Sequence, residues 1–278
     1  MNQNDFDTFF ESYSQNVDNA NTLNFWKLSD ALIFATIHKY IPTDLTNKMT
    51  ILDAGGGTGR WICDLSKVYK SNFILFDLSE DMLEVSRKNI EKSGIEDRVR
   101  IVQGDLTSMS EIPSDSVDYI VSIYSPISFV YQKEKALAEL YRIIKKGGII
   151  LMMGHGYYNA IASKINNHLA SQVELHALDT EYKVKWGNHV PLLNVFSRES
   201  MEKLLVDARF SIIATHGIPV FVQPGPEDWD ASNNKKSRIS GALQDDEFYK
   251  EVFNLEMKYN SIPEVANRGM NIFTVAQK

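Results

Sequence analysis

Three aspartates, Asp53, Asp77 and Asp105, are the residues of this sequence best placed to do chemistry. Asp53 and Asp77 each close a short apolar run, and Asp105 stands one glycine beyond another such run. Because apolar runs of this length between turn residues are typical of buried strands, all three are predicted at strand ends. A carboxylate there can accept hydrogen bonds from a ligand or pair with its cation.

A turn with four glycines begins two residues after Asp53. Gly55, Gly57 and Gly59 alternate with other residues in it. From Trp61 onward, apolar residues recur about one helical turn apart, which predicts a helix. Strand, glycine turn and helix in this order open a nucleotide-binding α/β unit, whose ligand lies directly against backbone. The spacing differs from the G-x-G-x-x-G of dinucleotide sites, and Asp53 would repel a phosphate but suits a cationic ammonium.

Asp77 admits two interpretations. An acidic residue at the end of the second strand binds ribose hydroxyls in folds of this type. A strand-end aspartate is also a common helix cap. Since Ser79 and Glu80 supply a capping candidate of their own, we expect the Asp77 carboxylate to be free for a ligand.

The three aspartates, with the glycine turn between the first two, resemble the motifs of the class I S-adenosylmethionine (SAM)-dependent methyltransferases. The resemblance covers residues 50–155 and extends loosely through two strands near the C-terminus. It includes the charged stop Lys145-Lys146-Gly147-Gly148 before an apolar strand. It implies SAM as methyl donor, S-adenosylhomocysteine (SAH) as product, and in-line transfer of the sulfonium methyl to a nucleophile that the protein positions.

The resemblance also implies roles for single positions. Asp105 would accept a hydrogen bond from the adenine amino group, although Gly-Asp is good chemistry for a plain tight turn as well. Met82 would pack under the adenine or serve as ordinary core, and Tyr13 would close on the SAM carboxylate. The implied cofactor-binding residues are Tyr13, Asp53, Gly55, Gly57, Asp77, Leu78, Met82, Gly104, Asp105, Leu106, Ser122 and Ile123.

Strands and helices alternate strictly as far as residue 155, which predicts a parallel sheet. Runs at 211–215 and 271–275 complete seven strands. We therefore expect an α/β protein with a seven-stranded, mostly parallel, doubly wound sheet, N-terminal helices and cap insertions. Residues 1–48 are predicted to form a helical lid or to cover a sheet edge. Residues 49–278 are predicted to form the SAM-binding domain, with insertions at about 156–190 and 224–268. A helical pattern spans Ala160–Leu175 in the first insertion.

Residues for the methyl acceptor are less defined. His155, between two glycines after the fifth strand, is the candidate general base, and a loop histidine bonded to backbone is the alternative. The aromatic residues predicted either to wall an acceptor pocket or to form cap core are Trp26, Tyr124, Tyr157, Tyr158 and Trp186. The histidine spacings match no metal pattern, so no metal is expected.

Several substrate classes are disfavoured. The fourth strand ends in Ile123-Tyr124-Ser125-Pro126. This differs from the Asn/Asp-Pro-Pro-Tyr/Phe of enzymes that methylate amino groups of nucleic acids and glutamine, and it offers no carboxylate for a magnesium-dependent catechol-type reaction. A formal charge of −7 also argues against a nucleic-acid partner.

The sequence carries no signal-peptide pattern and no apolar run of membrane-span length, so we expect a cytoplasmic protein without a membrane partner. The single cysteine, Cys63, excludes an internal disulfide. The expected activity is SAM-dependent methylation of O or N on a small-molecule acceptor. Methylation of a peptide or protein and a non-catalytic SAM-binding regulatory module are the alternatives, and the glycine spacing disfavours an NAD-linked reductase. The acceptor and the oligomeric state stay open.

Overall fold

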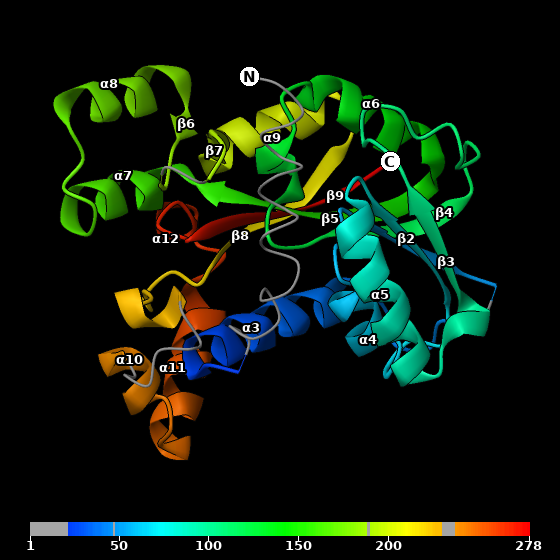
Figure 1. Ribbon diagram of the computed structural model, residues 1–278, viewed down its shortest axis with the longest axis horizontal. Coiled ribbons are helices and arrows are strands. Elements are labelled where there is room, and N and C mark those ends of the chain that lie inside the picture. The colour runs from blue at the N-terminus through cyan, green and yellow to red at the C-terminus, as the bar shows by residue number, and fades with distance from the viewer. Residues whose placement is uncertain (1–21, 47, 188–189, 230–236) are drawn as a thin grey trace.

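A computed structural model describes residues 22–46, 48–187, 190–229 and 237–278 (Figure 1). These residues form one nine-stranded sheet with helices on both faces. The strands are β1 (Thr50–Ala54), β2 (Asn72–Asp77), β3 (Val99–Gln103), β4 (Val117–Ser122), β5 (Ile144–Gly156), β6 (Lys183–Val184), β7 (Leu193–Phe196), β8 (Ser211–Ile218) and β9 (Asn271–Gln277).

The predicted seven-stranded sheet is confirmed, and two short strands extend it. Strands β3, β2, β1, β4 and β5 lie side by side and parallel. Strand β9 runs antiparallel to both β5 and β8. The additional strands come from the first predicted insertion and its continuation: β7 pairs in parallel with the last residues of β5, and β6 pairs with β7. Since parallel strands share one carboxyl edge, the ends of β1, β2, β3 and β4 meet there.

The α-helices are α3 (Asn24–Tyr40), α4 (Arg60–Leu65), α5 (Glu80–Ser93), α6 (Lys133–Ile143), α7 (Tyr157–Asn166), α8 (Gln172–Glu181), α9 (Arg198–Asp207), α10 (Arg238–Ala242), α11 (Asp246–Tyr259) and α12 (Pro263–Ala266). Short 3-10 helices are η1 (Glu96–Arg98), η2 (Pro126–Phe129) and η3 (Pro226–Trp229).

Alternation along the strands builds a core on each face of the sheet. Ile51 and Val121 face the layer that contains α3, α4 and α5. Their neighbours Leu52 and Ile120 face the layer that contains α6 and α9. Both faces of the central strands are therefore apolar, as a doubly wound parallel sheet requires, and the sheet positions the site at its carboxyl edge.

The first insertion is helical over most of the predicted pattern. Residues Ala160–Leu175 fall on α7 and the start of α8, with a break between the two helices. Leu169 has a left-handed φ of 46° within the break. Ser171 then starts α8 with a capping box, in which its hydroxyl accepts the Glu174 N–H and the Glu174 carboxylate accepts the Ser171 N–H. This capping chemistry outweighs the continuous periodicity.

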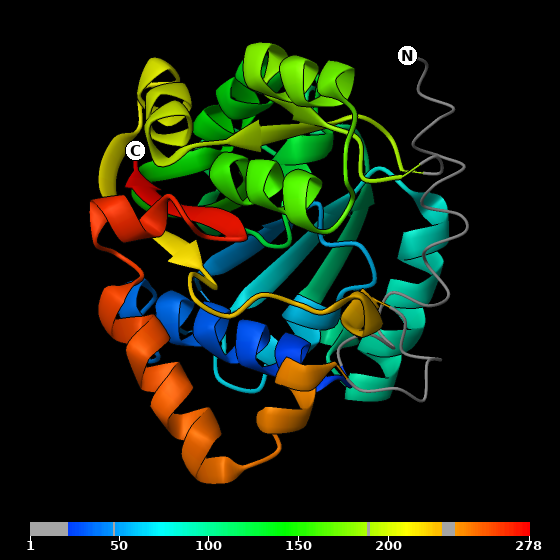
Figure 2. The same ribbon diagram turned by 90° about the vertical axis from the view of Figure 1, so that its left-hand side faces the viewer.

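The predicted lid is described from residue 22 onward, and Tyr13 lies outside the described residues. Helix α3 packs its buried face on the same core as α4 and α5. Figure 2 shows α7 and α8 on one side of the carboxyl edge of the sheet, with α3, α10 and α11 on the other. Within the described ranges, no helix combines the length and the apolar composition that a membrane span needs.

Candidate active site at the carboxyl edge of the sheet

The glycine turn leaves β1 as a left-handed loop. Gly55, Gly57 and Gly59 have φ of 78°, 52° and 71°. The N–H of Gly55 donates to the Phe76 carbonyl across 2.8 Å, which fixes the loop to the end of β2. Among the described residues, a Cβ at Gly57 would meet only the Met82 sulfur within 4 Å, at 3.8 Å. One face of the loop backbone is therefore open to a ligand.

Gly55 is required for packing as well as for its φ. A Cβ there would lie 2.4 Å from the Pro126 Cβ. We expect Gly55→Ala to lower the free energy of unfolding by about 2–4 kcal/mol, as left-handed strain and a steric clash combine. Gly94 is the matched control, since it has a φ of 63° and no atom within 4 Å of its Cβ position. Gly94→Ala should cost about 1 kcal/mol. Denaturant unfolding measures both, and equal losses would contradict the clash.

Asp53 is buried beneath this loop. Its side chain is 1% exposed, and its Oδ2 has no hydrogen-bond partner in the described part of the chain. The pKa of Asp53 is raised to about 7, mainly by burial and secondly by the negative charge of Asp77. The positive charge of Arg60 partly offsets this rise. A buried carboxylate oxygen without a partner costs free energy, and a cationic ligand would remove that cost.

Asp77 is not free, contrary to the expectation from the sequence. Its Oδ2 accepts the Gly57 N–H and its Oδ1 accepts the Ser79 N–H, each across 2.9 Å. The predicted cap is confirmed, because the Ser79 hydroxyl accepts the Met82 N–H at the start of α5. The Leu78 backbone N–H also hydrogen-bonds to this carboxylate. Because a carboxylate has about four acceptor positions, Asp77 keeps acceptor capacity for a ligand hydroxyl while it holds the loop against β2. Burial raises its pKa.

Two further candidates, Leu78 and Met82, follow Asp77 in the chain. Met82 is buried and Leu78 is exposed. Gly104 is required by packing, since a Cβ there would lie 2.5 Å from the Phe76 ring. These positions frame the surface between the ends of β2 and β3.

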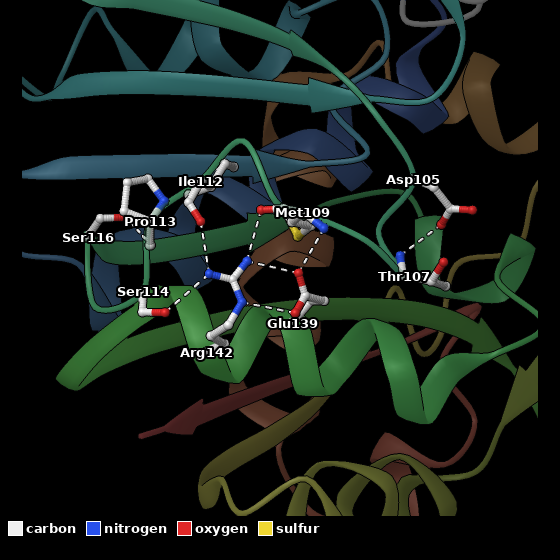
Figure 3. A network of polar contacts seen from close by, with 9 residues as sticks. All are labelled: Asp105, Thr107, Met109, Ile112, Pro113, Ser114, Ser116, Glu139 and Arg142. Atoms are coloured by element: carbon white, nitrogen blue, oxygen red, sulfur yellow. Dashed lines mark hydrogen bonds and ion pairs between the residues drawn. The ribbon is translucent and has the colours of Figure 1, made fainter.

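Asp105 lies exposed in the loop that follows β3, and Leu106 beside it is half-buried. The Asp105 Oδ1 accepts the Thr107 N–H across 2.8 Å, so the tight turn considered from the sequence exists. Figure 3 shows Arg142 of α6 holding the continuation of this loop through the Ile112 and Met109 carbonyls, at 2.9 Å each. Helix α6 thereby positions the loop, and within the described residues the other Asp105 oxygen accepts no hydrogen bond in this turn.

Two candidates at the end of β4 point inward. The Ser122 hydroxyl donates to the Ala54 carbonyl across 2.9 Å, and Ile123 is 5% exposed in the core. Only their backbone faces the edge of the sheet. Tyr124 and Ser125 follow with φ of 57° and 69°, a strained conformation for residues other than glycine.

Tyr124 belongs to a cluster that the sequence motifs did not identify. Its hydroxyl donates to the Asp30 carboxylate of α3. Asp30 also binds both terminal nitrogens of Arg60, the first residue of α4, at 2.6 and 3.3 Å. Trp26 packs on Tyr124 with ring centroids 5.9 Å apart, and on Trp229 with centroids 5.1 Å apart. The place of Arg60 directly after Gly59 is a usable signal, but nothing in the sequence pairs it with Asp30.

The remaining candidates form a separate group in the cap. His155 lies between the rings of Phe129 and Trp186, with centroids 6.5 Å from each. Its backbone N–H donates to the Ser128 hydroxyl, and burial lowers its pKa to about 4. Tyr157 is buried in the cap core with its hydroxyl on Asp179, and Tyr158 is 49% exposed. The structure therefore brings Trp26 and Tyr124 to the glycine loop and groups Tyr157 and Trp186 elsewhere.

The carboxylates and the loop backbone at this edge of the sheet fit the SAM that the motifs imply. The unpartnered Asp53 oxygen suits an ammonium, the left-handed glycine backbone is open at Gly57, and Asp77 keeps acceptor capacity. These three observations agree with one ligand that carries a cation next to a nucleoside.

Comparisons with known proteins also point to a SAM-dependent methyltransferase. Residues 51–148 match a family model described as a methyltransferase domain. The ubiquinone/menaquinone biosynthesis C-methyltransferase UbiE of Vibrio vulnificus is 35% identical over 105 residues, which are 37% of this chain and 40% of UbiE. The tRNA 5-carboxymethoxyuridine methyltransferase of Escherichia coli is 23% identical over 177 residues, 63% of this chain and 64% of that protein. The chain thus spans less than two thirds of either relative.

A solved structure shares the fold. Geranyl diphosphate C-methyltransferase from Streptomyces coelicolor, in complex with Mg²⁺, geranyl diphosphate and SAH, superposes with a TM-score of 0.54 at 15% identity, covering 90% of this chain and 78% of that one. This likeness concerns the fold alone. The family is identified by sequence: residues 51–148 are a methyltransferase domain, and the strand-end aspartates are of the class I, SAM-dependent type.

Proposed function

We propose that this protein transfers the methyl group of SAM to an oxygen or nitrogen of a small-molecule acceptor. The observation that carries the cofactor part is the buried Asp53 Oδ2, which has no hydrogen-bond partner among the described residues and lies beside an open glycine loop. In this proposal, SAM supplies an electrophilic sulfonium methyl. Asp53 holds the ammonium, Asp77 accepts the ribose hydroxyls, and Asp105 accepts the adenine amino group.

The acceptor is proposed to bind beside Tyr124 at the end of β4. Trp26, Tyr124 and Trp229 provide aromatic surface there, and Asp30 provides a carboxylate. Residues 22–46 contribute Asp30 and Trp26, which supports the proposed role of the N-terminal region as a lid over the domain from residue 49. The net charge of −7 supports a small acceptor over RNA.

His155 stays a candidate base. Its pKa of about 4 keeps the imidazole neutral at pH 7, so it can accept a proton, although weakly. A carbon acceptor is the second candidate function. It is favoured by the 35% identity to UbiE, which is named as a C-methyltransferase.

Incubation with methyl-labelled SAM and separated small-molecule, RNA and protein fractions of a cell extract tests the proposal. We expect SAH to form and label to enter the small-molecule fraction only. Mass spectrometry of the labelled product then identifies O-, N- or C-methylation. Label confined to RNA or protein would contradict the acceptor class, and SAH binding without transfer to any fraction would favour a regulatory module.

A further inference from the structure

Arg60 and Asp30 form a two-pronged ion pair at the glycine loop. The Arg60 Nη1 lies 2.6 Å from the Asp30 Oδ2, and the Arg60 Nη2 lies 3.3 Å from the Asp30 Oδ1. The two side chains are 19% and 16% exposed. This parallel arrangement is how a guanidinium binds any carboxylate, so the fork is a formed carboxylate site with a side chain of the same chain in it.

The orientation of the fork is fixed by aromatic rings. The Arg60 guanidinium carbon lies 5.0 Å from the centroid of the Trp61 ring and 5.6 Å from that of Tyr124. The Trp61 Nε1–H is itself buried with no acceptor in the described part of the chain. The rings of Trp61 and Tyr124 thus hold the guanidinium in place, and a planar guanidinium presents its N–H groups in a fixed fork that matches a carboxylate.

A second acidic side chain lies under the glycine loop that leads into Arg60. Arg60 lowers the pKa of Asp53, so the guanidinium acts on that carboxylate electrostatically. The Asp53 Oδ2 has no hydrogen-bond partner in the described residues. A carboxylate oxygen with open acceptor capacity, together with a cation, is complementary to an amino-acid zwitterion, whose ammonium and carboxylate are held two bonds apart on one carbon.

We propose that the Arg60 fork binds the carboxylate of the amino-acid end of the cofactor, and that Asp30 is its internal competitor. This inference rests on the proposed function, since it assumes that SAM binds at the glycine loop. Cofactor binding then exchanges one carboxylate for another on Arg60. Asp30 keeps the Tyr124 hydroxyl but loses its cation, so a charged carboxylate is released beside Tyr124 only when the cofactor is loaded.

Calorimetry with two ligands tests the exchange. SAH contains the amino-acid end, and 5′-methylthioadenosine lacks it. Asp30→Asn should tighten SAH binding about three- to tenfold, because the competing ion pair is removed. Arg60→Ala should weaken SAH binding at least about tenfold, because a two-pronged carboxylate contact is lost. Neither variant should change binding of 5′-methylthioadenosine by more than about twofold.

Asp118→Asn is the matched control. Asp118 pairs with Lys145, and its side chain is 14% exposed, but it lies near the start of β4, at the opposite edge of the sheet. Its SAH affinity should equal that of the unmodified protein, and thermal melting should show that all three variants fold.

The outcomes separate the two proposals. If the unmodified protein binds SAH but Asp30→Asn binds it equally or more weakly, Asp30 is no competitor and this inference is wrong. Unchanged SAH binding by Arg60→Ala would equally overturn the carboxylate site. If the folded, unmodified protein binds neither SAH nor 5′-methylthioadenosine, the proposed function fails together with the inference.

Discussion

Asp77→Ala is expected to weaken SAH binding by roughly two to four orders of magnitude. The Asp77 carboxylate is proposed to accept two ribose hydroxyls, and each hydrogen bond to a charged acceptor contributes about 1.5–3 kcal/mol. The same carboxylate holds the Gly57 and Ser79 N–H groups. Its removal therefore also loosens the loop at Gly57, although the Gly55 N–H still holds the start of the loop to the Phe76 carbonyl, and this adds to the loss.

Isothermal titration calorimetry measures this prediction. Asp97 is the control, because it is an exposed aspartate in the short helix η1 before β3, and Asp97→Ala should leave SAH affinity within about twofold. Asp77→Asn separates the two roles, since an amide oxygen can still accept one backbone N–H while the charge is lost. We expect it to bind SAH with intermediate affinity. Full affinity in Asp77→Ala would show that the ribose does not bind at the end of β2.

Asp53→Asn is expected to raise the free energy of unfolding at pH 8, on the order of 2–4 kcal/mol, and to weaken SAH binding. The pKa of Asp53 is raised by burial from 3.8 to about 7 in the folded protein. Between pH 3.8 and about pH 7, the Asp53 carboxyl is therefore protonated in the folded protein and ionised in the unfolded protein. The contribution of Asp53 to the free energy of unfolding is therefore greatest below pH 3.8 and falls as the pH rises to about 7. An asparagine at this position does not ionise, so it avoids this loss of stability.

Chemical denaturation at pH 5.5 and pH 8 tests the stability effect, and the advantage of Asp53→Asn should be larger at pH 8. An ammonium favours the ionised form of Asp53, so SAH binding to the unmodified protein should tighten from pH 6 to pH 7.5 with release of a proton. Titration in buffers of different ionisation enthalpy detects that proton. Asp53→Asn should show neither dependence. An equal pH dependence in both proteins would assign the titration to another group.

The scaffold of the site follows from local sequence patterns. A strand end, a glycine turn and the aspartates Asp53, Asp77 and Asp105 are recorded in local patterns, because burial selects apolar runs and left-handed φ selects glycine. The cap of α5 at Ser79 is equally local, because a serine directly before a helix accepts a backbone N–H of its first turn. These features depend on residues only a few positions apart.

Which groups share the site depends on how distant elements pack together. Asp30 and Arg60 are 30 residues apart, and they meet because α3 packs across the core layer that also contains α4. The engagement of Asp77 by Gly57 likewise requires β2 to lie beside β1, and the placement of His155 among cap aromatics requires the folded insertion. Such contacts depend on which faces of distant elements meet, and the spacing of residues along the chain does not encode that.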